Sequence, residues 1–132
     1  MRIVVSATEK DINGPVDVRF GRCPYFLVIE AEGKSIKSHR AVENRSANQM
    51  GAAGMTSAQE VAEMKPDAII TVNIGPRAFV VFKQLGIDVY QAGGTVKEAV
   101  EALLQGKLKK VEGSTGPGHM GMPGFGQGRR MQ

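Results

Sequence analysis

The chain has 132 residues, a formal net charge of +4, a hydrophobic share of 42% and a charged share of 23%. This size and balance indicate one globular domain with a real core. So mild a charge, with no dense basic run and no interleaved aromatic and basic residues, argues against nucleic-acid binding. A single cysteine, no apolar run of membrane-spanning length and an early polar N-terminus predict a cytoplasmic protein without membrane association.

The first half of the chain predicts three strands. Arg2–Ala7 is a β-branched run typical of a buried strand, and residues 25–31 predict a second. Gly33 lies in a turn, so residues 36–43 should return antiparallel to the second strand. Strict alternation would place one set of side chains on one face of this third strand: Ile36, Ser38, Arg40 and Val42.

A helix and a covered strand follow. Thr56 and Gln59 have the spacing of a capping box, which predicts a helix that starts at Thr56. The helix should stop before Pro66. Residues 67–72 are almost wholly apolar, as expected of a parallel strand buried on both faces.

The remaining elements repeat this strand–helix order. Pro76 is placed to open a second helix, and residues 87–92 predict another strand. Thr95 and Glu98 form a second capping box, and Gly106 is a natural end for this last helix.

These elements predict an α/β fold with a mixed five-stranded sheet, one antiparallel hairpin strand, and helices on its faces. We expect one domain over residues 1–112. Residues 113–132 contain seven of the 17 glycines and predict a flexible tail.

Two strand–helix loops are candidates for ligand binding. Right-handed crossovers place the loops after Val72 and Gln91 at the same edge of the sheet. Helix N-termini there would attract an anion, and glycine would let it approach the backbone. The alternative is that these loops only turn and cap the helices. The residues concerned are Asn73, Gly75, Gly93, Gly94 and Thr95.

A third glycine-rich stretch, "SANQMGAAGM", includes Gly51. It could admit a ligand at the start of a helix, although it lacks the Lys-Ser/Thr ending of a phosphate-binding loop. The alternative is a junction that needs close packing.

Soft metal ligands occur at two places. Cys23 lies on the turn "FGRCPYF", where Arg19 and Arg22 would favour the thiolate that binds soft metals. His119 in the tail precedes Met120, and imidazole with thioether suits copper. The alternatives are a thiol that only packs in the core and a tail with chance ligands.

The segments "VDVRFGRCPYFLVIE", "VNIGPRAF", "GIDVYQAGGTVKEAVEALLQGKL" and "QMGAAG" together resemble the dinitrogenase iron–molybdenum cofactor biosynthesis family, from about Arg2 to Leu108. The resemblance implies a ribonuclease H-like three-layer fold. It also implies a non-enzymatic binding or carrier protein for a metal–sulfur cluster or thiometallate. Several cofactor-carrying members have histidine where this chain has Arg19.

The implied cofactor is an iron–sulfur cluster or a sulfide cluster containing molybdenum or copper. Arg19 would supply positive potential and Cys23 one ligand. The other ligands would come from inorganic sulfide, the tail or a second subunit, which predicts a homodimer, and delivery predicts a partner protein.

Two other functions remain open from sequence. One is a regulatory or interaction module that binds a small anion or a partner protein. The other is a ribonuclease H-type nuclease, which is disfavoured because the first strand carries no acid and Asp67 begins its strand away from the ligand edge.

Overall fold

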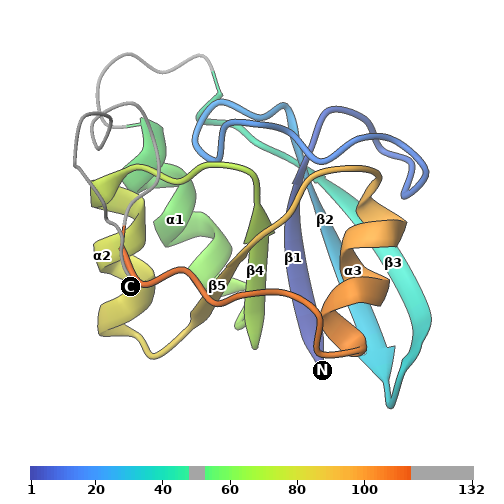
Figure 1. The fold of residues 1–132 in the computed structure, drawn as a ribbon. Coiled ribbons are helices and arrows are strands. Elements are labelled where there is room, and N and C mark those ends of the chain that lie inside the picture. The colour runs from blue at the N-terminus through green and yellow to red at the C-terminus, as the bar shows by residue number, and fades with distance from the viewer. Residues whose placement is uncertain (48–52, 114–132) are drawn as a thin grey trace.

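The computed structural model describes residues 1–47 and 53–113, and it confirms the mixed five-stranded sheet with three helices. The strand order is β3-β2-β1-β4-β5 (Figure 1). The strands are β1 (Arg2–Ala7), β2 (Tyr25–Glu32), β3 (Ser35–Glu43), β4 (Ala68–Thr71) and β5 (Asp88–Gln91). The helices are α1 (Ala53–Glu63), α2 (Pro76–Gln84) and α3 (Val96–Leu104).

The sheet is parallel in one half and antiparallel in the other, as the sequence predicts. β1 is parallel to β4, and β4 is parallel to β5, whereas β2 is antiparallel to both β1 and β3. All four residues of β4 are buried, which explains its unbroken apolar sequence. The carboxyl ends of β1, β4 and β5 therefore meet at one edge of the sheet.

Helices cover both faces of the sheet and make three layers (Figure 1). On one face α3 packs Val96, Val100 and Leu103 against a core that includes Leu27 and Ile70. The core on the opposite face joins α1, α2 and the sheet: Val4, Phe20, Phe26, Ala58, Val61, Ile69, Ala78, Phe82 and Val89. Alternate residues of each central strand thus supply two separate cores.

Two of the three described helices begin where the sequence predicts. Pro76 opens α2, and the capping box of Thr95 and Glu98 opens α3. Gly86 and Gly106 follow the C-caps with positive φ angles of 72° and 74°. The predicted start of the first helix at Thr56 is wrong, because α1 begins at Ala53.

A capping-box spacing can occur inside a helix, and here Thr56 already lies within α1. The preceding Ala53 is a strong helix former, so the chain has no reason to delay the helix until Thr56. Gly51 lies outside the described residues.

The strict alternation predicted for β3 is also wrong. The β2–β3 register shifts between Glu30 and Ala31, so that Lys37 is an extra residue on β3. Ile36 consequently packs against the core on the α3 side, while Val42 packs on the opposite side. A local insertion of this kind reverses side-chain orientation along the rest of the strand.

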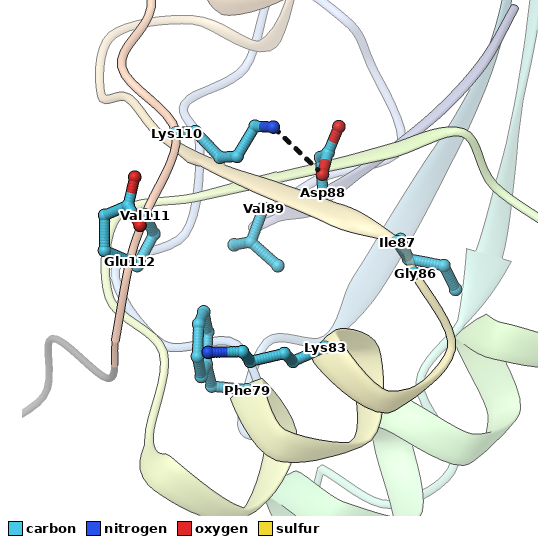
Figure 2. Close-up of a pocket in the computed structure, with 9 residues that line it drawn as sticks. All are labelled: Phe79, Lys83, Gly86, Ile87, Asp88, Val89, Lys110, Val111 and Glu112. Carbon is cyan, nitrogen blue, oxygen red and sulfur yellow. Dashed lines mark ion pairs between the residues drawn. The ribbon is translucent and has the colours of Figure 1, made fainter.

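The β5 edge of the sheet is covered by the chain that follows α3. The backbone N–H of Val111 donates to the carbonyl of Val89 at 2.7 Å, and Lys110 Nζ lies 3.4 Å from Asp88 Oδ1. A small cavity of about 170 Å³ separates this segment from Phe79 and Lys83 of α2 (Figure 2). The C-terminal segment thus protects β5 from pairing with another chain.

The predicted tail, with His119, lies outside the described residues, and its flexibility stays a prediction, as does the single domain over residues 1–112. Within residues 1–47 and 53–113, no helix has both the length and the apolar character needed to cross a bilayer.

Candidate functional site

Three loops meet beyond the carboxyl ends of the parallel strands. We call residues 15–22, 72–77 and 92–95 the strand-end surface. Arg19 forms a parallel bridge with Asn73, and Pro15 forms an antiparallel bridge with Thr95. The long loop between β1 and β2 therefore contacts both strand–helix loops, and it brings the predicted residues Arg19, Asn73 and Thr95 to one surface.

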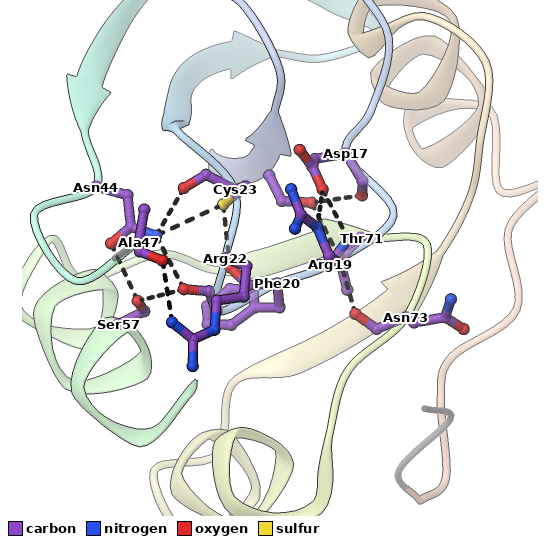
Figure 3. Close-up of polar contacts among 12 residues, drawn as sticks. Asp17, Arg19, Phe20, Arg22, Cys23, Asn44, Ala47, Ser57, Thr71 and Asn73 are labelled. Carbon is purple, nitrogen blue, oxygen red and sulfur yellow. Dashed lines mark hydrogen bonds and ion pairs between the residues drawn. The ribbon is translucent and has the colours of Figure 1, made fainter. Parts of the chain in front are cut away.

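A buried polar chain fixes the position of Arg19. Ser6 Oγ donates to the Asp17 carbonyl at 3.1 Å and lies 2.9 Å from Thr71 Oγ1. Thr71 Oγ1 in turn donates to the carbonyl of Asn73 at 3.1 Å. These contacts join the end of β1, the β1–β2 loop and the end of β4 (Figure 3). Sequence analysis missed Ser6, Asp17 and Thr71, which look like ordinary polar residues until the strands are paired.

The backbone of Arg19 is fixed by a hydrogen bond, whereas its guanidinium group is largely exposed. The carboxylate of Asp17 accepts the backbone N–H of Arg19 at 2.8 Å and lies 3.5 Å from Arg19 Nε. The Asp17 side chain is 4% exposed, whereas that of Arg19 is 61% exposed (Figure 3). The guanidinium therefore has donors left for a second anion, since it carries five N–H groups.

The backbone N–H groups at the start of α2 are not capped by other parts of the described chain. Gly75 is the N-cap, no side chain caps this helix, and Pro76 has no N–H to offer. No described residue accepts the backbone N–H of Arg77 or Ala78. A Cβ on Gly75 would meet nothing within 4 Å, and its φ of −79° is ordinary. The fold itself thus does not require glycine here, and a ligand can reach these donors.

The start of α3 is different, and the prediction of a second open helix end is wrong. The N–H of Val96 donates to the Gly14 carbonyl at 2.9 Å, and the N–H of Lys97 donates to the Ile12 carbonyl at 2.8 Å. Thr95 Oγ1 accepts the N–H of Glu98 at 3.0 Å. The β1–β2 loop and the capping box together occupy the first three donors of this helix.

Two of the three residues predicted before α3, Gly94 and Thr95, have structural roles in the described fold. Gly94 has a φ of +78°, and its carbonyl accepts the N–H of Val16 at 2.9 Å. Gly93 is exposed with open space around it, and Thr95 caps the helix. A ligand contact at Gly93, Gly94 or Thr95 stays a prediction.

Cys23 is a buried thiol rather than an exposed thiolate. Its exposure is 0%, and its Sγ donates to the carbonyl of Phe20 at 3.0 Å. Burial, with a smaller contribution from the charge of Asp17, raises the pKa of Cys23 from 9.0 to about 12. The prediction that Arg19 and Arg22 favour the thiolate is therefore wrong, because the loss of hydration dominates. Whether Cys23 ever binds a metal stays a prediction.

Asn44, which sequence analysis missed, holds the Cys23 loop in place. Its Nδ2 donates to the carbonyls of Gly21 and Cys23 at 3.2 and 2.7 Å, and its Oδ1 accepts from Ser57 Oγ at 3.0 Å (Figure 3). Arg22 Nη1 donates to the carbonyl of Ala47 at 3.2 Å. An asparagine directly after a predicted strand was the available signal, but its partners are distant in sequence.

The described residues offer donors to an anion but do not encircle a metal ion. Within residues 1–47 and 53–113, no three His, Cys, Asp or Glu side chains gather as a metal site. His119 and Gly51 lie outside these ranges, so their predicted roles are untested. The exposed guanidinium of Arg19 and the open N–H groups at the start of α2 are hydrogen-bond donors of the kind that anions accept.

Comparisons with known proteins point to one family. The family described as dinitrogenase iron-molybdenum cofactor matches residues 1–106. An uncharacterized protein of Methanocaldococcus jannaschii is 46% identical over 101 residues, which cover 76% of this chain and 86% of that protein.

Two solved structures are similar in fold and sequence. The apo form of the orange protein from Desulfovibrio gigas has a TM-score of 0.78 and 33% identity, over 87% of this chain and 96% of that one. The NMR structure of a NifB-like protein from Thermotoga has a TM-score of 0.73 and 31% identity, over 88% of this chain and 97% of that one.

Proposed function

This chain belongs to the dinitrogenase iron-molybdenum cofactor family, and from that premise we propose that it is a non-enzymatic carrier of an anionic metal–sulfur cluster or thiometallate. The similar orange protein is known in an apo form, which implies that this relative also takes up a bound group. The proposal includes the ribonuclease H-like fold and the delivery of the cargo to a partner protein.

One observation carries the proposal: the backbone of Arg19, whose guanidinium is exposed, pairs with the backbone of Asn73, two residues before Gly75, the N-cap of the uncapped helix α2. A guanidinium and unbonded backbone N–H groups both donate to anions, and the dipole of α2 adds positive potential at the same place. Sulfide atoms on the outside of a cluster would accept these hydrogen bonds.

The chemistry of the described residues favours a cargo held without direct protein–metal bonds. An iron–sulfur cluster of the usual kind takes several cysteine thiolates, and Cys23 is a single neutral thiol inside the core. A thiometallate, whose metals are bonded to inorganic sulfide, needs only charge and hydrogen-bond complementarity. Cys23 as an added ligand would require the core to open. Both Cys23 and His119 as added ligands remain part of the proposal.

Anaerobic uptake of tetrathiomolybdate, with and without copper(I), tests this function. The expected result is a stable visible absorption spectrum that stays with the protein through gel filtration. Replacing Arg19→Ala should weaken uptake roughly tenfold, because a hydrogen bond to a charged group contributes about 1.5 kcal/mol. Arg40→Ala is the matched control, since this exposed arginine lies on β3, away from the strand-end surface.

Equal uptake by the Arg19 and Arg40 variants would contradict the proposed position of the cargo. Failure of the unaltered protein to retain any thiometallate, or any iron–sulfur cluster formed from iron and sulfide, would contradict the function itself. Gel filtration of the loaded protein also tests the proposed homodimer, which should appear when the cargo is bound.

The nuclease alternative gains no support from the described residues. The carboxylate of Asp67 accepts the backbone N–H of Arg2 at 2.7 Å, at the edge of the sheet opposite the strand-end surface. The residues described contain no cluster of three acidic or other metal-binding side chains. Two-metal hydrolysis needs such a cluster.

A further inference from the structure

The two edge strands of the sheet are covered to different extents. Residues 110–111 lie along β5 (Figure 2), whereas β3, within the described residues, pairs with β2 alone. β3 is nine residues long and mostly exposed. An edge strand of this length presents a row of backbone N–H and C=O groups that can pair with another extended chain.

A groove of about 440 Å³ runs beside this open strand, between β3 and α3. Ile12 and Ile36, both partly buried against the α3-side core, give it an apolar floor. Its walls carry Lys34, Lys37 and Lys97, whereas Glu101 is the only acidic residue among the described residues of the lining. Figure 1 shows α3 and β3 side by side at this edge. The groove is therefore positively charged with an apolar base.

The bulge places one of these lysines where a regular strand would not. Lys37 is the extra residue of β3, and its Nζ also lies 3.2 Å from Glu32 Oε1 on the neighbouring strand. Lysine on an edge strand commonly serves to prevent pairing with copies of the same chain. A second copy would bring a further set of the same positive residues, Lys34, Lys37 and Arg40, to this edge. An acidic chain would meet no such repulsion.

We propose that β3 and this groove bind an extended acidic segment of a partner protein. The segment extends the sheet by pairing with the β3 backbone. Alternate side chains of an added strand point to the same face, so its acidic residues lie along the lysines of the groove. The groove shares no residue with the strand-end surface, so this proposal does not depend on cargo binding there.

The test uses the full chain without metal, labelled with ¹⁵N, and a synthetic nonapeptide that alternates glutamate with valine or threonine. The expected result is a shift of the backbone amide signals of residues 35–43 and of Lys97, with slower hydrogen exchange along β3. The binding should weaken as salt is added. A peptide with lysine at each glutamate position should bind at least tenfold more weakly, and so should one with alternate N-methylated amides.

Protein variants make the test specific to the groove. The double substitution Lys37→Glu with Lys97→Glu should weaken peptide binding at least tenfold. The control Lys83→Glu with Lys109→Glu makes the same charge change at exposed positions outside the groove and should have less than a twofold effect. Thiometallate uptake by the groove double variant should be unchanged, which separates this proposal from the carrier function.

Three results would overturn the proposal. One is the absence of β3 amide shifts at millimolar peptide. Another is equal binding of the lysine and glutamate peptides. The third is sedimentation evidence that the chain dimerises through β3 by itself, with the same amide signals shifting on dilution.

Discussion

The starts of α2 and α3 look alike in sequence and differ in what they can bind. Each helix follows a parallel strand and a loop with glycine. At α3 the carbonyls of Ile12 and Gly14 and the side chain of Thr95 accept the first three N–H groups. At α2 no side chain caps the helix, and no described residue accepts the N–H of Arg77.

This difference shows that a helix N-terminus becomes an anion site only where the rest of the chain leaves it open. The β1–β2 loop decides which of the two remains open. Its first part, up to Gly14, covers α3, and its later part brings Arg19 beside Asn73. The same loop therefore closes one candidate site and completes the other.

The largest effect that we predict concerns Cys23, which packs in the same core as α2. Because its pKa is raised from 9.0 to about 12, the thiolate fraction at pH 8 should be roughly a thousandfold lower than that of a free thiol. Reaction with iodoacetamide, followed by mass spectrometry in native buffer and in urea, measures this. Equal rates in the two conditions would mean that Cys23 is open and available as a ligand.

The two loop glycines should differ in stability effect. Gly94→Ala forces an L residue to a φ of +78°, with its Cβ 3.0 Å from Glu98 Oε1. We expect it to lower the free energy of unfolding by about 1–2 kcal/mol. Gly75→Ala should change stability by less than about 0.5 kcal/mol, because the site has room and an ordinary φ. Urea unfolding of both variants checks this order, and a reversed order would break the comparison.

The smallest effect that we predict concerns the pKa of Glu98 and the stability of the protein at acid pH. The pKa of Glu98 is lowered, mainly by the backbone N–H of Thr95 and then by its hydroxyl. Because the pKa of Glu98 is lower in the folded protein than in the unfolded chain, the ionised carboxylate stabilises the folded protein above the unfolded pKa of about 4.3. This stabilisation is lost as the pH falls through the pKa of Glu98 in the folded protein. NMR titration should show Glu98 as more acidic than a free glutamate, and Thr95→Ala should reduce the difference, because the variant loses the hydroxyl but keeps the backbone N–H. An unchanged pKa of Glu98 in that variant would show that the hydroxyl of Thr95 makes no contribution.

Sequence reasoning found the features that depend on neighbouring residues. The capping box of Thr95 and Glu98, Pro76 at the start of α2 and the left-handed Gly106 each act over a few positions, and their signals are local. The parallel half of the sheet was predicted from the apolar run in β4 and the repeated strand–helix order, and the shared edge of the two loops from the handedness of crossovers.

Features that depend on distant residues could not be predicted. The closure of α3 by Ile12 and Gly14 joins segments more than 80 residues apart in the chain. The bulge at Lys37 depends on the partner strand, and the burial of Cys23 depends on α1, α2 and Asn44. No short sequence pattern records such partners. Sequence reasoning therefore placed the two strand–helix loops at one edge of the sheet, but it could not tell which of the two helix starts is open.

The central claim is that the start of α2, and not that of α3, receives an anionic metal sulfide beside Arg19. Titration of the ¹⁵N-labelled full chain with tetrathiomolybdate, under exclusion of oxygen, tests it most directly. The account predicts that the amide signals of Arg77 and Ala78 and the guanidinium signal of Arg19 shift together, while those of Val96 and Lys97 stay in place. Shifts at Val96 and Lys97 without shifts at Arg77 would contradict it.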